Sequence, residues 1–333
     1  MSAADAALRA ELRARPRAWL VTGAAGFIGS HLVERLLELG QRVRGLDDFS
    51  TGRPENLPLG REGFEFVRGD VRDARAVERA LAGVELVLHQ AALGSVPRSL
   101  ADPERTLAVN AQGTWTVLAA ARAAGCARVV YASSSSVYGD SQRLPHAEDE
   151  LGRPLSPYAA SKRCAELAAL GVTRGLGLAT VGLRYFNVFG PRQAPEGEYA
   201  AVIPRWCAAL AAGRAPLIHG DGSTTRDFTP VETVVRANLL AALGGPGTAG
   251  AVLNVGTGVE TRLDALFAAL QRAFAAAGRE RSGVRARHVE ARPHDRTRSR
   301  ANTARARAEL GLEPGDLESG LTRTVASYLA AER

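Results

Sequence analysis

Lysine is nearly absent from this chain of 333 residues. Of its 42 basic residues only Lys162 is a lysine, and all the others are arginines. Such a chain uses arginine wherever a plain positive charge is enough, so we expect a lysine to persist only where a forked guanidinium does not fit. Lys162 is therefore the first candidate functional residue.

Other scarcities exclude whole classes of protein. Aromatic residues make up 5% of the chain, too few for base stacking, so we expect no nucleic-acid partner despite the net charge of +7. The chain has no apolar run of the roughly 18 residues that a membrane span needs, and the first 18 residues lack the apolar core of a secretory signal. The three cysteines have neither metal-ligand nor disulfide-framework spacing, which favours a reducing cytoplasm and no metal site: Cys126, Cys164 and Cys207.

The first half of the chain alternates short apolar runs with helical patterns, as βαβ units do. This alternation predicts an α/β fold with a doubly wound parallel (Rossmann) sheet. The expected strands are 19–21, 41–46, 65–68, 86–89, 128–132 and 180–185, and the expected helices are 31–39, 74–82, 104–124 and 157–174.

After residue 186 the alternation loosens into Gly/Pro-rich loops and helices expected at 203–212, 231–243 and 262–277. We expect residues 231–256 to return to the sheet. The predicted domains are a nucleotide-binding domain (17–185 plus 230–256), a smaller C-terminal substrate-binding domain (186–229 plus 257–333) and an N-terminal extension (1–16).

A glycine-rich turn joins the first expected strand to the first expected helix. In that setting, glycines let the backbone approach a pyrophosphate at the helix N-terminus. The turn predicts a dinucleotide site at Gly23, Gly26, Phe27, Ile28 and Gly29.

An acidic residue at the end of the second strand favours NAD over NADP. Asp47 is placed to bind the ribose 2′-hydroxyl and to repel a 2′-phosphate. The nearby Arg44 and Arg53 leave NADP open as an alternative. The ends of the next strands place further residues on the cofactor, with Asp70 and Val71 at the adenine, and Gln90, Ala91 and Ala92 along the phosphates and ribose.

Tyr158 lies four residues before Lys162, which puts both side chains on one face of a helix. A neighbouring ammonium lowers the pKa of a phenol and makes it usable for proton transfer near neutral pH. A run of serines, 133–136, follows the fifth strand, where ligands bind in open α/β sheets. A hydroxyl there can bond a substrate oxygen as it changes between alcohol and ketone. The alternatives are a surface helix pair and an ordinary turn.

Together, the glycine turn, the serine segment and Tyr158-x-x-x-Lys162 resemble the extended short-chain dehydrogenase/reductases, over residues 17–330. Three longer segments resemble nucleoside-diphosphate-sugar 4-epimerases, in particular the bacterial group that acts on UDP-N-acetylglucosamine and UDP-N-acetylgalactosamine: residues 89–99, 182–192 and 220–228.

The resemblance implies a mechanism. Tyr158 would take the proton of the sugar 4-hydroxyl while NAD⁺ takes the C4 hydride. The 4-keto sugar would then rotate in the site, so that the hydride and the proton return to its other face. Lys162 would bind the nicotinamide ribose, Ser134 would be the catalytic serine and Ser136 a helper hydroxyl. Asn110 and Tyr185 would join the cofactor-binding residues.

The resemblance also implies substrate contacts. The expected substrate-binding residues are Ser95, Val96, Arg98 and Ser134 near the sugar, Asn187, Arg226 and Arg292 on the phosphates, Ala201 and Val202 beside the nucleotide, and Asp295 on its ribose. Ser299 falls where the family walls off the sugar 2-substituent, and so small a residue leaves room for an N-acetyl group. UDP-glucose and UDP-galactose are the open second pair of substrates. The segment 294–302 departs from the Gly-Asp-Val-Arg pattern of the family.

Rival functions leave different marks on the sequence. A 4,6-dehydratase needs an acid and a base beside the catalytic serine, and residues 134–137 hold neither. A UDP-glucuronate or UDP-N-acetylglucosaminuronate 4-epimerase stays open, because Arg98 with Ser99 can meet a carboxylate. A non-catalytic nucleotide sensor on the same fold is the other alternative, and it has no need of Lys162. For Arg226, the alternative to binding a phosphate is a surface salt bridge with Asp227. The family also implies a homodimer, in which helices 104–124 and 157–174 form a four-helix bundle.

Overall fold

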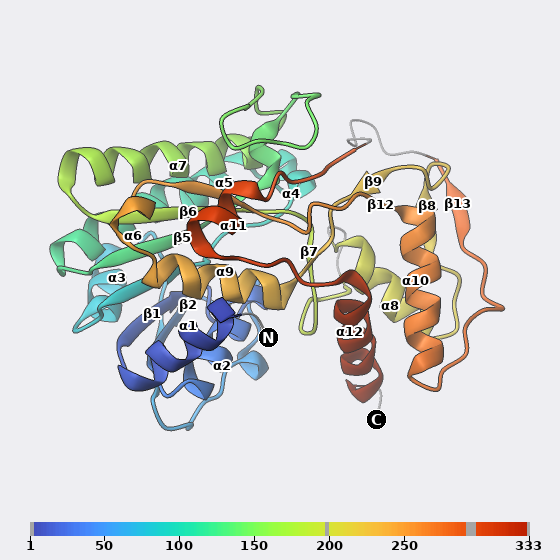
Figure 1. Ribbon diagram of the computed structural model, residues 1–333, viewed down its shortest axis with the longest axis horizontal. Helices are drawn as coiled ribbons and strands as arrows, with labels where there is room; N and C mark the ends of the chain where they lie inside the picture. Colours follow the sequence, from blue (N-terminus) through green and yellow to red (C-terminus); the bar gives the residue numbers. More distant parts are fainter. Residues whose placement is uncertain (1–2, 197–199, 291–297, 332–333) are drawn as a thin grey trace.

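The computed structural model describes residues 3–196, 200–290 and 298–331, and its centre is a parallel seven-stranded sheet (Figure 1). The strand order is β3-β2-β1-β4-β5-β6-β11, so the order reverses between β1 and β4. This confirms the predicted doubly wound sheet. The strands are β1 (Ala18–Thr22), β2 (Arg42–Asp47), β3 (Phe64–Arg68), β4 (Leu86–His89), β5 (Arg128–Ser134), β6 (Ala179–Tyr185) and β11 (Val252–Val255).

Helices cover both faces of the sheet because each buries an apolar stripe against it. One face carries α3 (Ala74–Leu81), α6 (Gly113–Ala123) and α7 (Pro157–Leu176). The other face carries α2 (Phe27–Glu38), α9 (Val231–Leu243) and α11 (Ala304–Leu310). The helix expected over 104–124 is in fact α5 (Pro103–Leu107), a π-helical turn η2 (Ala108–Gln112) and α6.

A second core lies beside the sheet, on the right of Figure 1. It is formed by α8 (Val202–Ala211), α10 (Leu263–Ala276) and α12 (Leu317–Ala331). Three two-stranded pairs accompany it: β7 (Val188–Phe189) with β10 (Thr229–Pro230), β8 (Leu217–His219) with β13 (Arg287–Val289), and β9 (Thr225–Arg226) with β12 (Thr261–Arg262). The remaining short helices are α4 (Val96–Ala101), η1 (Pro54–Asn56), η3 (Ser135–Tyr138) and η4 (Pro246–Thr248).

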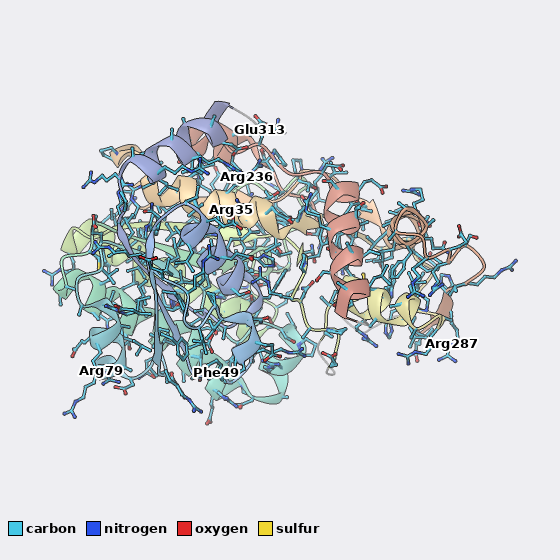
Figure 2. All side chains as sticks on the ribbon, turned by 90° about the horizontal axis from the view of Figure 1, so that it is seen from below. Arg35, Phe49, Arg79, Arg236, Arg287 and Glu313 are labelled. Atoms are coloured by element: carbon cyan, nitrogen blue, oxygen red, sulfur yellow. The ribbon has the colours of Figure 1, made fainter. Side chains whose placement is uncertain are left out.

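The N-terminal helix and the segment that precedes α12 both pack on the sheet domain. The segment 1–16 contains α1 (Ala3–Ala14), whose Leu8 and Leu12 are buried. Its Asp5 forms an ion pair at 3.1 Å with Arg236 of α9, which Figure 2 labels. The sequence assigned 257–333 to the substrate domain, but Ala306, Leu310 and Leu312 pack in the core of the sheet domain. That part of the predicted boundary is wrong. Within the described ranges, no helix has the length and apolarity needed to span a membrane.

Candidate active site

The turn after β1 accepts only glycine at two positions. Gly23 has φ +67°, and a Cβ on Gly29 would lie 1.9 Å from the Gly23 carbonyl oxygen. Gly26 precedes α2 without capping it by a side chain. The first N–H groups of α2 therefore face the turn, where an anion can take them.

A cavity of about 280 Å³ opens at this turn, along the carboxyl ends of β1, β2, β4 and β5. Among the residues that line it, those expected from the sequence are Gly23, Gly26, Phe27, Ile28, Gly29, Asp47, Asp70, Val71, Gln90, Ala91, Ala92, Tyr158, Lys162 and Tyr185. It is also lined by Asp48, Ser50, Thr51, Leu93 and Val109, which the sequence did not suggest. Four of these lie in loops beyond strand ends and Val109 lies in the π-helical turn η2, and in neither place does position along the chain tell which residues face a cavity.

Asn110 supports the wall of this cavity from behind. It is buried, its Oδ1 accepts from the Leu93 amide (2.8 Å), and its Nδ2 donates to the Leu93 carbonyl (3.1 Å) and to Ser161 Oγ (3.0 Å). Asn110 is not among the described residues that line the cavity but holds the loop that does, and its direct contact with the cofactor stays a prediction.

The chain's own contacts favour NAD over NADP. Asp47 is held by the amides of Ala25 (2.9 Å) and Phe49 (2.8 Å), and burial raises the pKa of its carboxyl. Arg44 is bound to Glu65, and Arg53 to Glu196 (2.7 Å). Both arginines that left NADP open as an alternative thus have acidic partners.

Helix α7 brings Tyr158 and Lys162 to the cavity. Ser156 caps the helix by accepting from the Ala159 amide (3.1 Å), and Gly177 ends it in the left-handed conformation. Tyr158 therefore sits in the first turn, where the helix dipole favours negative charge. The Lys162 ammonium is buried and donates to the Ala132 carbonyl (3.0 Å).

The pKa of Tyr158 differs from the sequence expectation. Burial raises the pKa of this phenol above its usual value, and a side-chain hydrogen bond with Ser134 acts in the opposite direction. Burial also lowers the pKa of Lys162 to about 8. The expectation that the neighbouring ammonium gives Tyr158 a lowered pKa is therefore wrong, because desolvation is the larger effect.

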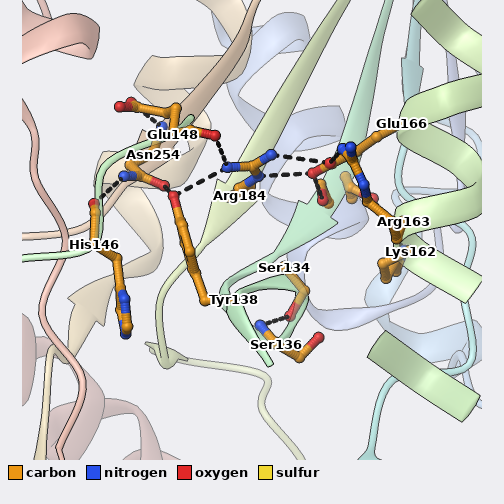
Figure 3. A network of polar contacts seen from close by, with 12 residues as sticks. Ser134, Ser136, Tyr138, His146, Glu148, Lys162, Arg163, Glu166, Arg184 and Asn254 are labelled. Carbon is orange, nitrogen blue, oxygen red and sulfur yellow. Dashed lines mark hydrogen bonds and ion pairs between the residues drawn. The ribbon is translucent and has the colours of Figure 1, made fainter. Parts of the chain in front are cut away.

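The serine segment supplies two further hydroxyls. Ser134 ends β5, and its Oγ accepts from the Ser136 amide (3.1 Å; Figure 3). Ser136 Oγ is buried and has no hydrogen-bond partner within the described residues. A buried hydroxyl without a partner is costly, so Ser136 is well suited to bond a ligand.

The expected sugar-binding residues lie around α4. Ser95 caps α4 by accepting from the Arg98 amide (3.3 Å), and it has φ +127°, a strained value of the kind that clusters at binding sites. Val96 begins α4 and is partly exposed. Ser99 is fully buried and donates to the Val96 carbonyl (2.7 Å), so its hydroxyl is already used. This removes Ser99 from the pair suggested for a uronate.

A second cavity, of about 580 Å³, lies in the second-core region, lined by α8, by residues of β7, β8, β9 and β13, and by the start of α10. The expected substrate residues Asn187, Ala201, Val202 and Arg226 line it. The cavity is also lined by Arg205, Arg214, His219 and Arg287. The sequence did not single these residues out, because the chain contains so many arginines. Their side chains suit a phosphorylated ligand.

Asp227 fixes the loops beside this cavity. Its carboxylate accepts from the amides of Thr257 (2.7 Å), Gly258 (2.9 Å) and Ala301 (3.0 Å). Ser299, two residues before Ala301, is buried and is not among the described residues that line either cavity. The expected substrate residues Arg292 and Asp295 lie outside the described residues.

The fold and the glycine turn match an established family. A family model described as the NAD dependent epimerase/dehydratase family matches residues 19–256, and the chain belongs to that family. This confirms the resemblance drawn from the motifs and NAD as the cofactor, whose pyrophosphate the N–H groups at the start of α2 would bind.

Individual relatives are epimerases and dehydratases. The chain is 44% identical over 317 residues to a UDP-glucose 4-epimerase of Mycolicibacterium smegmatis, covering 92% of this chain and 96% of the relative. It is 39% identical over 318 residues to a dTDP-glucose 4,6-dehydratase of Streptomyces griseus, covering 93% of each. Among solved structures, the UDP-N-acetylglucosamine 4-epimerase of Methanobrevibacter ruminantium, in complex with UDP-N-acetylmuramic acid, is 34% identical with a TM-score of 0.89, covering 95% of this chain and 99% of that one.

Proposed function

We propose that this protein is an NAD-dependent 4-epimerase that interconverts UDP-N-acetylglucosamine and UDP-N-acetylgalactosamine. The observation that carries the proposal is the group formed by Tyr158, Lys162 and Ser134 at the end of β5, beside the NAD cavity and free of any acidic neighbour in the serine segment. The epimerases among the relatives named above support the same reaction.

Each side chain has a defined task. Tyr158 Oη takes the proton of the sugar 4-hydroxyl and later returns one to the opposite face. Ser134, hydrogen-bonded to Tyr158, and the unpartnered Ser136 bond the sugar oxygen as it changes between alcohol and ketone. NAD⁺ supplies the hydride acceptor for C4 and a positive ring charge that favours the phenolate.

The second cavity suits the nucleoside diphosphate. Arg226 and Asn187 line it beside Ala201 and Val202, and guanidinium–phosphate pairs are charge-assisted and often bidentate. Arg292 and Asp295 are proposed to complete this site, and Ser299 to leave space for the N-acetyl group. UDP-glucose and UDP-galactose remain the second candidate pair.

A 4,6-dehydratase is the strongest rival, because one close relative has that activity. Such an enzyme needs an acid and a base at C5 and C6 of the sugar. Residues 134–137 are Ser-Ser-Ser-Val. The nearby Glu166 already accepts from Ser133, Arg163 and Arg184, so it is not free for this role. Because neither residues 134–137 nor Glu166 supplies a free acid or base for dehydration, the side chains beside Tyr158 favour epimerisation.

A substrate panel without added NAD tests the proposal. UDP-GlcNAc, UDP-GalNAc, UDP-glucose, UDP-galactose and their uronates are followed by proton NMR at C1. Interconversion of the N-acetyl pair supports the proposal, and conversion of the uronates alone contradicts the specificity. Formation of a 4-keto-6-deoxy product establishes the dehydratase instead. Tyr158→Phe is expected to abolish turnover while UDP-sugar binding is retained.

We also propose a homodimer formed by the α5–α6 segment and α7. Large apolar side chains are exposed on these helices, among them Leu107, Trp115 and Leu167. Exposed apolar residues grouped on neighbouring helices are typical of a protein interface. A cytoplasmic location and a role in polysaccharide biosynthesis stay predictions.

A further inference from the structure

A buried ion pair lies directly behind the catalytic group. Glu166 of α7 and Arg184 of β6 are each 2% exposed, and the guanidinium holds the carboxylate through Nε (2.8 Å) and Nη2 (3.0 Å; Figure 3). Moving two charges out of water is expensive, so a pair this deep is stable only when its other hydrogen-bonding groups are also satisfied.

The remaining groups of the pair are satisfied by the catalytic region itself. Ser133 Oγ donates to Glu166 Oε1 (2.6 Å), and Arg163 donates to Oε2 (2.8 Å). On the other side, Arg184 Nη1 donates to the Tyr138 hydroxyl (3.1 Å) and to the Glu148 carbonyl (2.7 Å). The pair therefore joins α7, the end of β5 and the turn η3.

These contacts bracket the proposed catalytic residues. Glu166 lies one helical turn after Lys162, whose ammonium is bonded to Ala132, while Glu166 itself is bonded to Ser133. Two consecutive residues of β5 are thus fixed to α7 immediately before Ser134. Tyr138, held by Arg184, fixes the far end of the turn that begins at Ser134.

We propose that Glu166 and Arg184 are positioning residues for the reaction, and that the Glu166 carboxylate is the counter-charge of the Lys162 ammonium. The pair sets where Ser134 lies relative to Tyr158 by clamping the strand end and the turn to α7. Its role in turnover rests on the 4-epimerase function proposed above, whereas its effect on Lys162 does not depend on which sugar is bound.

The electrostatics around Lys162 agree with this geometry. Burial lowers the pKa of Lys162, and the charge of Glu166 raises it. His89 of β4 is neutral, since burial and the Lys162 charge lower its pKa to about 3. The other titratable or charged groups on the elements around Lys162 are Arg98 of α4, Glu104 and Arg105 of α5, Arg122 of α6, Arg128 and Tyr131 of β5, Tyr138 of η3, Tyr158, Arg163, Cys164 and Arg174 of α7, and Arg184 and Tyr185 of β6.

Removing the Glu166 charge takes away a group that favours the ammonium, so the pKa of Lys162 falls further. Lys162 then loses its proton at a lower pH, and the alkaline limb of the kcat profile moves to lower pH with it.

The only lysine of the chain makes this measurable without any assay of activity. Protein labelled with ¹³C at lysine Cε gives one lysine side-chain signal, whose shift against pH reports the Lys162 pKa. In Glu166→Gln we expect this pKa to fall by about 1 unit, the size expected for loss of a close opposite charge. Ser133→Ala, which removes a hydrogen bond but keeps the carboxylate, should leave it within about 0.3 units.

The kinetic readout uses the same proteins. With the sugar pair that the wild type converts, Glu166→Gln should lower kcat by about 10- to 100-fold and shift the alkaline limb, whereas Ser133→Ala should lower kcat without shifting it. An unchanged Lys162 pKa in Glu166→Gln overturns the proposal. So does an equal fall of kcat in both variants with no movement of the limb, which marks a purely structural role.

A double variant serves as a further control. Glu166→Gln leaves the Arg184 charge buried without its carboxylate, so it is compared with Glu166→Gln/Arg184→Met, in which neutral groups of similar volume replace both charges. The double variant loses a cation together with the anion, so its Lys162 pKa should lie between that of the wild type and that of Glu166→Gln, and a value below that of Glu166→Gln refutes the counter-charge. A wild type that converts no sugar contradicts the proposed function, while the NMR titration still decides the relation between Glu166 and Lys162.

Discussion

The glycine turn makes a sharp prediction for Gly29→Ala. A Cβ at this position would lie 1.9 Å from the carbonyl oxygen of Gly23, so the start of α2 and the turn must separate by about 1 Å or more to reach van der Waals contact. The atoms forced apart are backbone atoms of the cofactor-binding turn, which cannot rotate away as a side chain can.

The expected size of the effect follows from that displacement. A misplacement of about 1 Å in a binding constellation is enough to cost about 100-fold, so we expect the Kd for NAD⁺ to rise by about that factor. That factor corresponds to about 2.7 kcal/mol of binding free energy. Overpacking should also destabilise the fold by about 1–3 kcal/mol.

The assay is calorimetric titration of cofactor-stripped protein with NAD⁺, together with the NAD content of the protein as purified. Gly175→Ala is the matched control, because a Cβ there meets nothing within 4 Å, and it should bind NAD⁺ as the wild type does. Circular dichroism checks that both variants are folded. A folded Gly29→Ala protein whose Kd stays within about 3-fold of the wild type refutes the steric reasoning.

Three other substitutions test separate parts of the structure. Asp227→Ala leaves the amides of Thr257, Gly258 and Ala301 without their acceptor, so urea unfolding should show a loss of about 3–5 kcal/mol, and a loss below about 1 kcal/mol contradicts it. Trp115→Arg puts a charge on the exposed apolar surface of α6, so sedimentation should show a folded monomer; an unchanged dimer assigns the interface elsewhere. Ser299→Tyr should abolish turnover of N-acetylated UDP-sugars and spare UDP-glucose, and intact N-acetyl turnover with unchanged glucose activity removes Ser299 as the specificity residue.

The cofactor site was predictable because its signals are local. A glycine turn between strand and helix, and an acid at the end of the next strand, are spacing rules along the chain. The π-helical turn at 108–112 was not predictable, and neither was the inward-facing role of Asn110, because both depend on the loop that Asn110 holds.

The functional residues that were not predicted from the sequence are those whose burial and position depend on the fold. Glu166 has the local surroundings of an exposed glutamate, and only the packing of α7 on β6 buries it against Arg184. Arg205 and Arg214 are two arginines among many, and their place at a cavity depends on how α8 packs against the short strand pairs of the second core. The pKa of Tyr158 was mispredicted for the same reason, since desolvation is a property of the folded protein.

The position of β11 bears on how the chain is synthesised. The elements that carry the predicted catalytic residues, β5, η3 and α7, leave the ribosome before β11, and β6 stays an open edge until residues 252–255 emerge and pair with it. An unpaired edge strand is a template for association with other chains. Asn254 of β11 also accepts the hydrogen bond of the Tyr138 hydroxyl (2.6 Å), so the catalytic turn receives its last support from the strand that closes the sheet. A nascent or truncated chain that ends before β11 thus carries every proposed catalytic side chain and is still an aggregation hazard, which makes late synthesis the vulnerable stage in the life of this protein.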